Sequence, residues 1–521
     1  MIPPFSHLIR LARAGFVLAR EGVFALIDPT PLPGAAQLGL KALRLLERPT
    51  SASGAARLST ALGKLGPSYV KLGQFLATRP DVVGQAIATD LEKLQDRMPP
   101  FPQDQAEAAI ERSLGRPLHK MFASFGPPLA AASVAQVHRA EIDTPAGRRS
   151  VAVKVLRPGI EADLRADIQA FFFAARMAER MSAEARRLRF EEVVATLARS
   201  VTVEMDLRLE AAAASEMADN VKDDTDFRVP TVEWDLTAHN VLTTEWIDGT
   251  PLSDRAALER RGLDLPVLGR TVIQSFLRHA VRDGFFHADM HPGNLFVDDA
   301  GRLVAVDFGI MGRLTEKERR FLAEILYGFI SRNYRRTAEV HFEAGYVPGH
   351  HSVEAFMQAV RAIGEPIHNR NAEDISMAKL LTLLFEVTAL FDMKTRPELL
   401  LLQKTMVVVE GVGRMLDPKL DMWRTSEPVV RTWLERHLGP AGRVEGAVEG
   451  VGEVGRFLGG VPGLLGRGAR IAEQLDRATR DGIVLSPETV AGIGDAERRR
   501  ARGTTIALWV IAALLFLHLW R

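Results

Sequence analysis

HADMHPGNLFV, residues His287–Val297, is the stretch that decides the fold of this 521-residue chain. Within it Asp289 and Asn294 lie five residues apart, and Asp307, in VDFGI, follows thirteen residues after Asn294. Phosphoryl transfer needs a carboxylate near the attacking oxygen, together with carboxylate or amide oxygens that hold Mg²⁺ beside the phosphates. We therefore expect Asp289 to be the catalytic carboxylate, and Asn294 and Asp307 to hold the metal.

The spacing of these three residues matches the H-R-D-x-x-x-x-N and D-F-G signatures of protein kinases. Upstream, VAVKV places Lys154 in a predicted strand among apolar neighbours. A kinase lysine at this place holds the nucleotide phosphates and pairs with a glutamate on a helix. Three acids of VEMDLRLEAAA are candidates for that pairing, and the residues alone leave the choice open: Glu204, Asp206 and Glu210. On one continuous helix Asp206 and Glu210 would share a face, and Glu204 would point elsewhere.

The chain departs from protein kinases at the phosphate-covering loop. Where a glycine-rich loop would stand, it has AAASVAQVH, whose backbone N–H groups and serine hydroxyl can still donate to phosphate. The expected nucleotide contacts here are Ala130, Ala131, Ala132, Ser133, Val134, Ala135, Gln136 and Val137.

A second departure concerns the activation segment. Only five residues separate Gly309 from Thr315, which opens a T-x-x-E capping box with Glu318 and so begins a helix. A protein kinase needs a long segment here to dock a peptide. Ala288 replaces the arginine that would bind a phosphate on that segment. A protein substrate is therefore not expected.

The composition excludes several classes of binding partner and functional site. The formal net charge is +1 and there is no long basic stripe, so nucleic acid is not expected as a partner. The absence of cysteine excludes disulfides, thiolate metal sites and cysteine nucleophiles.

Both ends of the chain carry candidate membrane contacts. Three arginines interrupt residues 1–20, which predicts either a basic amphipathic helix on a membrane surface or an ordinary half-buried helix, rather than a secretory signal. Residues 504–520 are an apolar run of about 25 Å as a helix, close to the thickness of a bilayer core. RRRAR, residues 498–502, precedes it, so we expect a single C-terminal span with everything before it in the cytoplasm.

The patterns together predict an α+β, protein-kinase-like bilobal fold. Two strand-like stretches, 132–142 and 148–157, flank a hairpin turn, and residues 227–235 and 240–247 read as a further strand pair. The expected parts are a helical N-terminal extension, a small β-rich N-lobe, a helical C-lobe, a glycine-rich and basic linker, and a transmembrane helix: residues 1–110, 111–247, 248–436, 437–503 and 504–520.

The chain resembles the UbiB family of atypical kinase-like proteins, which includes the mitochondrial coenzyme Q homologues, over roughly residues 50–345. LGPSYVKLGQFLATRPD, residues 65–81, is similar to the family's K-x-G-Q signature, and EMDLRLEA to its E-x-D element with Glu210 as the lysine-pairing glutamate. The resemblance assigns regulatory roles to the residues of these two elements: Lys71, Gly73, Gln74, Glu204 and Asp206.

This resemblance implies that the N-terminal helices lie over the active site, with Lys71 reaching the E-x-D acids and taking part in catalysis. It implies ATP and Mg²⁺ as cofactors, and a hinge at Glu245–Ile247 whose backbone meets adenine. Such proteins act as ATPases rather than protein kinases and support ubiquinone biosynthesis. The expected location is a bacterial-type inner membrane. The expected partners are membrane lipid, a prenylated quinone precursor, and other quinone-biosynthesis proteins or a second copy of the chain.

Two other functions are compatible with the same motifs. One is a small-molecule or lipid phosphotransferase, since such enzymes also use an H-x-D-x-x-x-x-N loop. The other is a nucleotide-binding scaffold without turnover. The joint presence of Lys154, Asp289, Asn294 and Asp307 argues against the scaffold, because a scaffold need not keep every catalytic group.

Overall fold

A computed structural model of the chain describes residues 4–26, 43–48, 54–77, 83–91, 98–181, 183–368, 386–388, 390–393 and 397–438, with the single positions 41, 94 and 383. Within these residues no helix is both long and apolar enough to cross a membrane. The linker beyond residue 438 and the transmembrane helix at 504–520 lie outside the described residues, and both stay predictions.

Four antiparallel strands form the first sheet: β1 (Ser124–Ala131), β2 (Ala135–Thr144), β3 (Gly147–Leu156) and β5 (Val241–Glu245), in the order β1-β2-β3-β5. β2 and β3 make the predicted hairpin, which closes where Thr144 lies opposite Gly147. Gly147 has a φ of 115°, which side chains disfavour, so glycine is needed at the turn. β1 contains two prolines and is an edge strand, where a missing N–H is tolerated.

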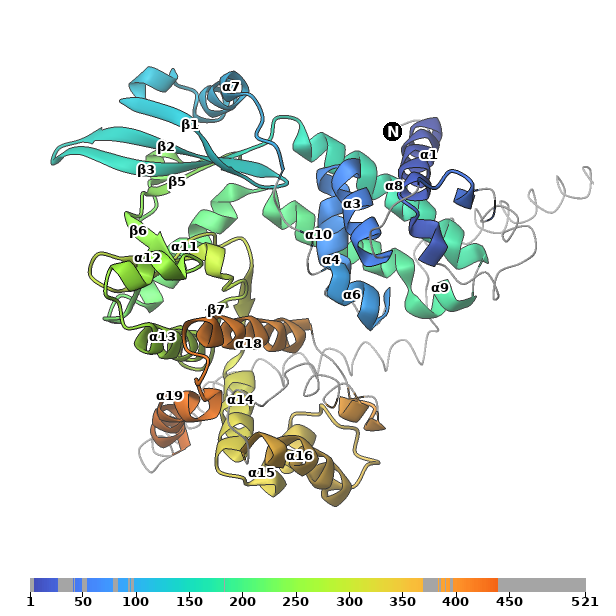
Figure 1. The fold of residues 1–521 in the computed structure, drawn as a ribbon, viewed down its shortest axis with the longest axis vertical. Helices are drawn as coiled ribbons and strands as arrows, with labels where there is room; N and C mark the ends of the chain where they lie inside the picture. Colours follow the sequence, from blue (N-terminus) through green and yellow to red (C-terminus); the bar gives the residue numbers. More distant parts are fainter. Residues whose placement is uncertain are drawn as a thin grey trace, which may run out of the picture. The chain divides into compact units, whose positions relative to one another are not determined.

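Helix α7 (Gln103–Leu114), followed by the 3-10 turn η2 (Leu118–Lys120), packs on this sheet, as Figure 1 shows. Ala106 and Ile110 of α7 are buried in one apolar cluster with Val151 and Val153 of β3. The predicted domain boundary at residue 110 thus falls inside a helix. Because the buried face of α7 belongs to the core of the sheet, α7 is part of the β-rich lobe rather than of the N-terminal extension.

Four helices follow β3: α8 (Ile160–Met181), α9 (Ala183–Leu188), α10 (Phe190–Glu204) and α11 (Leu207–Asn220). Residues 204–210 do not lie on one continuous helix. α10 ends at Glu204, and Asp206 caps α11 by accepting from the Arg208 N–H at 3.1 Å. Aspartate is a preferred N-cap residue, which explains why a new helix begins there. Glu204 and Glu210 consequently lie on different helices.

The N-terminal helices are α1 (Pro4–Arg20), η1 (Val23–Leu26), α3 (Gly54–Leu65), α4 (Pro67–Ala77) and α6 (Gln85–Leu91). α1 contacts α3 and α8, and α4 contacts α6, α8 and α10. Ala14 and Ala19 of α1 are buried, whereas Leu8, Ile9 and Phe16 are exposed. α1 is therefore half buried and has an apolar outer face.

A second sheet has the order β4-β9-β8-β6, with strands Phe227–Arg228, Leu303–Ala305, Leu295–Asp298 and Gly249–Pro251. Beside it β7 (Phe285–His287) pairs with β10 (Met311–Arg313). The predicted pairing of residues 227–235 with 240–247 is only partly met. β4 pairs with β9 instead, while the N–H of Glu233 donates to the carbonyl of Thr243, ahead of η3 (Trp234–Leu236).

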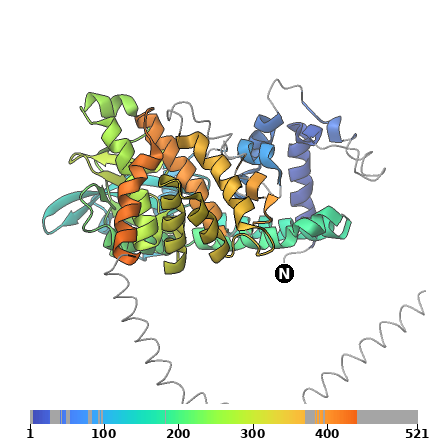
Figure 2. The same cartoon turned by 90° about the horizontal axis from the view of Figure 1, so that it is seen from below.

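The helical part contains α12 (Arg255–Arg260), α13 (Leu265–Arg278), the π-helical turn η4 (His279–Asp283), η5 (Pro292–Asn294), α14 (Glu316–Ile330), α15 (Tyr334–Glu343), α16 (Val353–His368), α18 (Pro397–Leu416) and α19 (Met422–Leu438). Figure 2 shows these helices running alongside one another. α13 packs closely on α18. Glycine allows this approach at Gly269, where a Cβ would lie only 3.0 Å from the Gly413 carbonyl. The capping box of Thr315 and Glu318 at the start of α14 is confirmed.

Candidate nucleotide-binding site

Lys154 connects three elements of the chain. It lies on β3, between β2 and β5, so it is a central-strand residue and not a solubilising lysine on an edge. Its Nζ donates to Oε1 and Oε2 of Glu210 at 2.8 and 3.0 Å, and to Oδ2 of Asp307 at 3.2 Å. Of the three acids that the sequence left open, Glu210 is the one that pairs with Lys154.

Electrostatics favour the charged forms of Lys154 and Asp307. Burial acts to lower the pKa of Lys154, but Asp307 and Glu210 raise it above its usual value. Burial acts to raise the pKa of Asp307, and Lys154 and the Gly309 N–H lower it to about 2. Burial raises the pKa of Glu210. The Asp307 side chain is 48% exposed, so an ionised carboxylate faces solvent beside a half-buried lysine.

Asp289 and Asn294 are joined directly in the loop after β7. The amide nitrogen Nδ2 of Asn294 donates to Oδ2 and to the backbone carbonyl of Asp289, each at 3.1 Å. This orientation leaves the amide oxygen of Asn294 as the atom that can hold a cation. His291 caps η5 by accepting from the Gly293 N–H at 3.1 Å, which gives it a structural place in the loop.

Asp307 follows this loop in a backbone conformation that is uncommon for a residue with a side chain. Its φ is 67°, in the left-handed region, and its Oδ1 accepts from the Gly309 N–H at 3.2 Å. The preceding residue, Val306, donates its N–H to the carbonyl of Asn294 at 2.9 Å. Backbone strain of this kind is common at functional sites, where the surroundings hold one residue in place. Asp307 and Asn294 are the residues whose oxygens fit Mg²⁺.

His287 orients the loop that carries Asp289 by a hydrogen bond to its backbone. It is buried, its Nδ1 accepts from the Asp289 N–H at 3.0 Å, and its ring lies 5.4 Å from that of Phe308. Burial lowers its pKa, so the ring is neutral. The neutral ring positions Asp289 through the backbone.

The alanine-rich loop joins β1 to β2 next to Lys154, because Val137 lies opposite Lys154. No residue between Ala130 and Val137 has a positive φ, so this loop conformation does not need glycine. Ser133 is fully buried, and the contact of its hydroxyl with a phosphate stays a prediction. The side chain of Gln136 is also buried, where it accepts from the Phe101 N–H at 2.9 Å.

Arg157 holds this loop from the end of β3, and sequence reasoning did not find it. Its guanidinium donates to the carbonyl of Ala132 at 3.0 Å and to that of Pro99 at 2.7 Å, and its own N–H donates to Val134 at 2.8 Å. The preceding V-A-V-K-V motif places Arg157 near the nucleotide site, but only the fold shows what it contacts.

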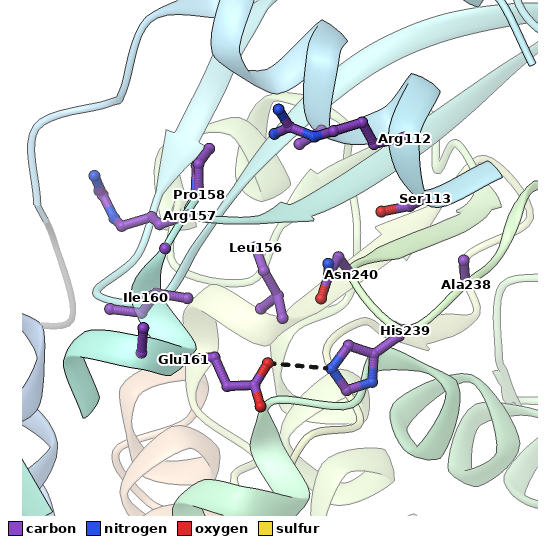
Figure 3. Close-up of a pocket in the computed structure, with 13 residues that line it drawn as sticks. Arg112, Ser113, Leu156, Arg157, Pro158, Ile160, Glu161, Ala238, His239 and Asn240 are labelled. Carbon is purple, nitrogen blue, oxygen red and sulfur yellow. Dashed lines mark ion pairs between the residues drawn. The ribbon is translucent and has the colours of Figure 1, made fainter. Parts of the chain in front are cut away.

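Arg157 also lines a cavity of about 440 Å³ at the start of α8, shown in Figure 3. Glu161 and His239 face one another across it at 3.8 Å. None of the residues predicted to bind ATP or Mg²⁺ lines this cavity. His239 does contact the E-x-D element, because its Nδ1 lies 3.4 Å from Oδ1 of Asp206.

Lys71 on α4 forms an ion pair with Glu204 at the end of α10. Asp206 instead binds Arg208, whose guanidinium lowers the pKa of Asp206 to about 2. Gly73 lies where α4 meets its neighbours, because a Cβ there would come 2.7 Å from Cδ1 of Leu62. Gln74 is half buried. The regulatory roles of these residues, and the position of the helices over the active site, stay predictions.

Glu245–Ile247 connects the first sheet to β6 of the second, which is where a hinge is expected. The Glu245 N–H donates to the carbonyl of Thr231 at 2.8 Å, and its carboxylate binds Arg228 at 3.0 Å. Both groups are therefore engaged within the protein. Ile247 is half buried. The contact of this segment with adenine stays a prediction.

Thr405 is a second residue that the sequence did not reveal. It lies on α18, is 1% exposed, and its hydroxyl donates to the carbonyl of Ala288 at 3.0 Å. The N–H of Ala288 donates to the carbonyl of Ile310 at 3.0 Å. The residue that replaces the kinase arginine is thus hydrogen-bonded to Ile310, just before β10, and to Thr405 on α18.

Comparisons with known proteins agree with this geometry. Residues 93–341 match the ABC1 atypical kinase-like domain, and residues 360–421 match the UbiB helical domain. A protein of Marinobacter nauticus named probable protein kinase UbiB is 41% identical over 447 residues, which cover 84% of this chain and 81% of the relative. This chain belongs to the UbiB family.

A second UbiB relative supports the same assignment. The probable protein kinase UbiB of Azotobacter vinelandii is 42% identical over 391 residues, 74% of this chain and 72% of the relative. A solved structure of Rv3197 with erythromycin, from Mycobacterium tuberculosis, is 26% identical and covers 78% of this chain and 98% of that chain, with a TM-score of 0.47. The UbiB membership gives the chain a kinase-like α+β fold with a β-sheet domain and a helical part.

Proposed function

We propose that this UbiB-family chain is a membrane-tethered, Mg²⁺-dependent ATPase or atypical kinase that serves ubiquinone biosynthesis. The acceptor of the phosphoryl group is water or a small or lipid molecule rather than a protein. The observation that carries the proposal is the Lys154 ammonium, bonded at once to Glu210 and to Asp307. It brings the phosphate-binding lysine and the metal-binding carboxylate of the kinase pattern within one hydrogen bond of each other.

Each residue of the cluster has a chemical task in this proposal. Lys154, oriented by Glu210, binds nucleotide phosphates, and Asp289, oriented by Asn294 and His287, accepts the proton of the attacking hydroxyl or water. Asp307 and Asn294 would hold Mg²⁺, which neutralises the charge of the phosphates when it is bound. Arg157 fixes the loop that covers them.

The segment after Asp307 supports the exclusion of protein substrates. Met311–Arg313 pairs with β7 as β10, and α14 begins at Glu316. Three of the six residues between the D-F-G motif and the helix are thus used in a strand. No long platform is left on which a peptide could dock.

Membrane tethering is supported by two features. The apolar run at residues 504–520 follows five positions that include four arginines. Leu8, Ile9 and Phe16 are exposed on α1, and Arg13 lies on the same helix. Exposed apolar side chains beside basic ones are typical of helices that bind a membrane surface.

Steady-state ATP hydrolysis by the full-length protein tests the site. We expect Mg²⁺-dependent turnover that rises with liposomes or a phenolic prenyl-lipid mimic, and a loss of at least about 100-fold in Asp307→Asn, because a preorganised charge at the phosphates is removed. Asp299→Asn is the matched control, since Asp299 is 90% exposed and pairs only at the surface with Arg261. Unchanged turnover in Asp307→Asn would mean that the site is wrongly placed.

Quinone profiling of a deletion strain tests the biological role. Complementation by the wild-type chain should restore ubiquinone, and complementation by Asp307→Asn should not. Full rescue by Asp307→Asn would instead indicate a scaffold that needs no turnover. A stoichiometric phosphorylated small molecule, detected by mass spectrometry, would indicate a phosphotransferase.

A further inference from the structure

His350, His351 and Asp392 converge away from the nucleotide site. The two histidines lie in the connection between α15 and α16, and Asp392 lies in the short described stretch before α18. Their candidate ligand atoms all lie within 4.8 Å of one another. Among the residues that the structure describes, this is the one group of three or more histidine, cysteine, aspartate or glutamate side chains with that property.

The distances between the ligand atoms are compatible with a metal ion held among them. Oδ2 of Asp392 lies 3.2 Å from Nε2 of His351 and 3.6 Å from Nε2 of His350. A tetrahedral Zn²⁺ with bonds of about 2.0–2.2 Å separates its ligand atoms by roughly 3.4 Å. One carboxylate oxygen is thus flanked by two imidazole nitrogens, and the imidazole rings are 4.1 Å apart.

The core beneath the three residues holds them in place. Phe391, which is buried, lies with its ring 5.2 Å from that of His351 and 5.0 Å from that of Phe356. Asp392 has a φ of 48°, in the left-handed region that aspartate tolerates better than most residues. The packing of Phe391 therefore fixes where the next residue, Asp392, presents its carboxylate.

We propose that His350, His351 and Asp392 form a Zn²⁺ site. Two imidazoles and one carboxylate select a transition ion over Mg²⁺, which prefers oxygen ligands. The side chains of His350 and Asp392 are 67% and 68% exposed, so the ion reaches the site from solvent and keeps water as its fourth ligand. The bound ion ties the connection between α15 and α16 to the segment that carries Phe391, and so stabilises the apolar cluster of Tyr334, Val347, Phe356 and Phe391.

Isothermal titration of tag-free full-length protein in detergent, stripped with a chelator and kept in excess Mg²⁺, tests the site. The excess Mg²⁺ competes with Zn²⁺ for Asp307 and Asn294, so that Zn²⁺ binding is read elsewhere. We expect one Zn²⁺ per chain. His351→Gln and Asp392→Asn should each weaken binding at least about 100-fold, because loss of an outer-shell partner alone typically costs 10–100-fold. Zn²⁺ should raise the thermal midpoint of the wild type and not that of the two variants.

His119→Gln is the control, because His119 is an exposed histidine outside the cluster. It should bind Zn²⁺ as the wild type does. Retained ATP turnover shows that each variant is folded. X-ray absorption at the zinc edge should show two imidazole ligands. The proposal is overturned by equal affinity in the wild type and Asp392→Asn, by equal loss in His119→Gln, or by a zinc spectrum without imidazole.

Discussion

At the scale of single residues, Ala288 acts through its backbone and not through its small side chain. Its backbone N–H and carbonyl connect the catalytic loop to Ile310 and to Thr405. In a protein kinase an arginine at this position reads the phosphorylation state of a long segment. Here the position is buried and both of its backbone groups are hydrogen-bonded within the protein. The catalytic loop is therefore held by the helical domain rather than switched by a modified segment.

We expect Thr405→Val to lower both stability and turnover. The variant removes the hydrogen bond to Ala288 and leaves a buried carbonyl with one partner fewer, which costs about 1 kcal/mol, typically 0.5–1.5. Turnover should fall several-fold through kcat, with KM for ATP little changed, because the loop that carries Asp289 loses a support. Chemical denaturation and ATPase kinetics measure the two effects.

Thr432→Val is the matched control for Thr405→Val. Thr432 lies exposed on α19, and its hydroxyl bonds only to the carbonyl four residues earlier, as Thr405 also does with Leu401. The control removes that local bond without touching the loop, so it should leave kcat unchanged. If both variants lower kcat equally, Thr405 has no special link to the catalytic loop.

Local spacing in the sequence was enough to find Asp289, Asn294, Asp307 and Lys154, because these residues follow fixed intervals within short motifs. Thr405 and Arg157 could not be found in this way. The partner of Thr405 lies 117 residues away, and Arg157 acts on carbonyl groups, which every residue has. The burial of Ser133 could not be predicted for a related reason, since it depends on packing that no short motif records.

At the scale of elements, Gly73 shows why α4 can approach its neighbours so closely. A Cβ at this position would lie 2.7 Å from Leu62 and 3.2 Å from Leu94. We expect Gly73→Ala to cost about 1–3 kcal/mol of stability, as overpacking usually does. Gly63→Ala, on the adjoining helix α3 with nothing within 4 Å, should instead gain about 0.5–1 kcal/mol. Thermal denaturation measures the stability of the two variants. Equal changes in stability for both would contradict the packing argument.

The ion pair between Lys71 and Glu204 joins α4 to α10 beside the break before α11. Both side chains are mostly buried, so a double-mutant cycle with Lys71→Gln and Glu204→Gln should show a coupling free energy of stability of roughly 0.5–3 kcal/mol. The pair of Lys64 and Glu21 is the control. It has the same chemistry, but Lys64 is largely exposed, so its coupling should be about 0.2–1 kcal/mol. A smaller coupling at Lys71 than at Lys64 would show that the pair is incidental.

Element boundaries were the part of the fold least accessible to sequence reasoning. The periodicity of residues 160–220 indicated helices correctly, yet it did not show the break at Asp206, because a single capping aspartate interrupts an otherwise continuous pattern. Likewise α7 reads as one more helix of the N-terminal extension. Only the burial of Ala106 and Ile110 against the strands places it with the sheet.

At the scale of the whole molecule, the described residues through Leu434 form one compact unit. We expect a chain ending at Leu438 to keep ATP turnover within about twofold, because the groups that bind nucleotide lie inside that unit. Its binding to liposomes should fall at least tenfold, since a spanning helix anchors far more strongly than a surface helix. Co-sedimentation measures the binding, and undiminished binding would assign the tether to another segment.

The hydrogen bond between Thr405 and Ala288 also sets an order of events while the protein is being made. Ala288 leaves the ribosome 117 residues before Thr405. At 5–20 residues per second, the loop spends roughly 6–23 seconds without that support. A nascent chain therefore carries all its nucleotide-binding motifs well before the loop can reach its final geometry. Unfinished or prematurely terminated chains therefore lack one support of the loop that carries Asp289.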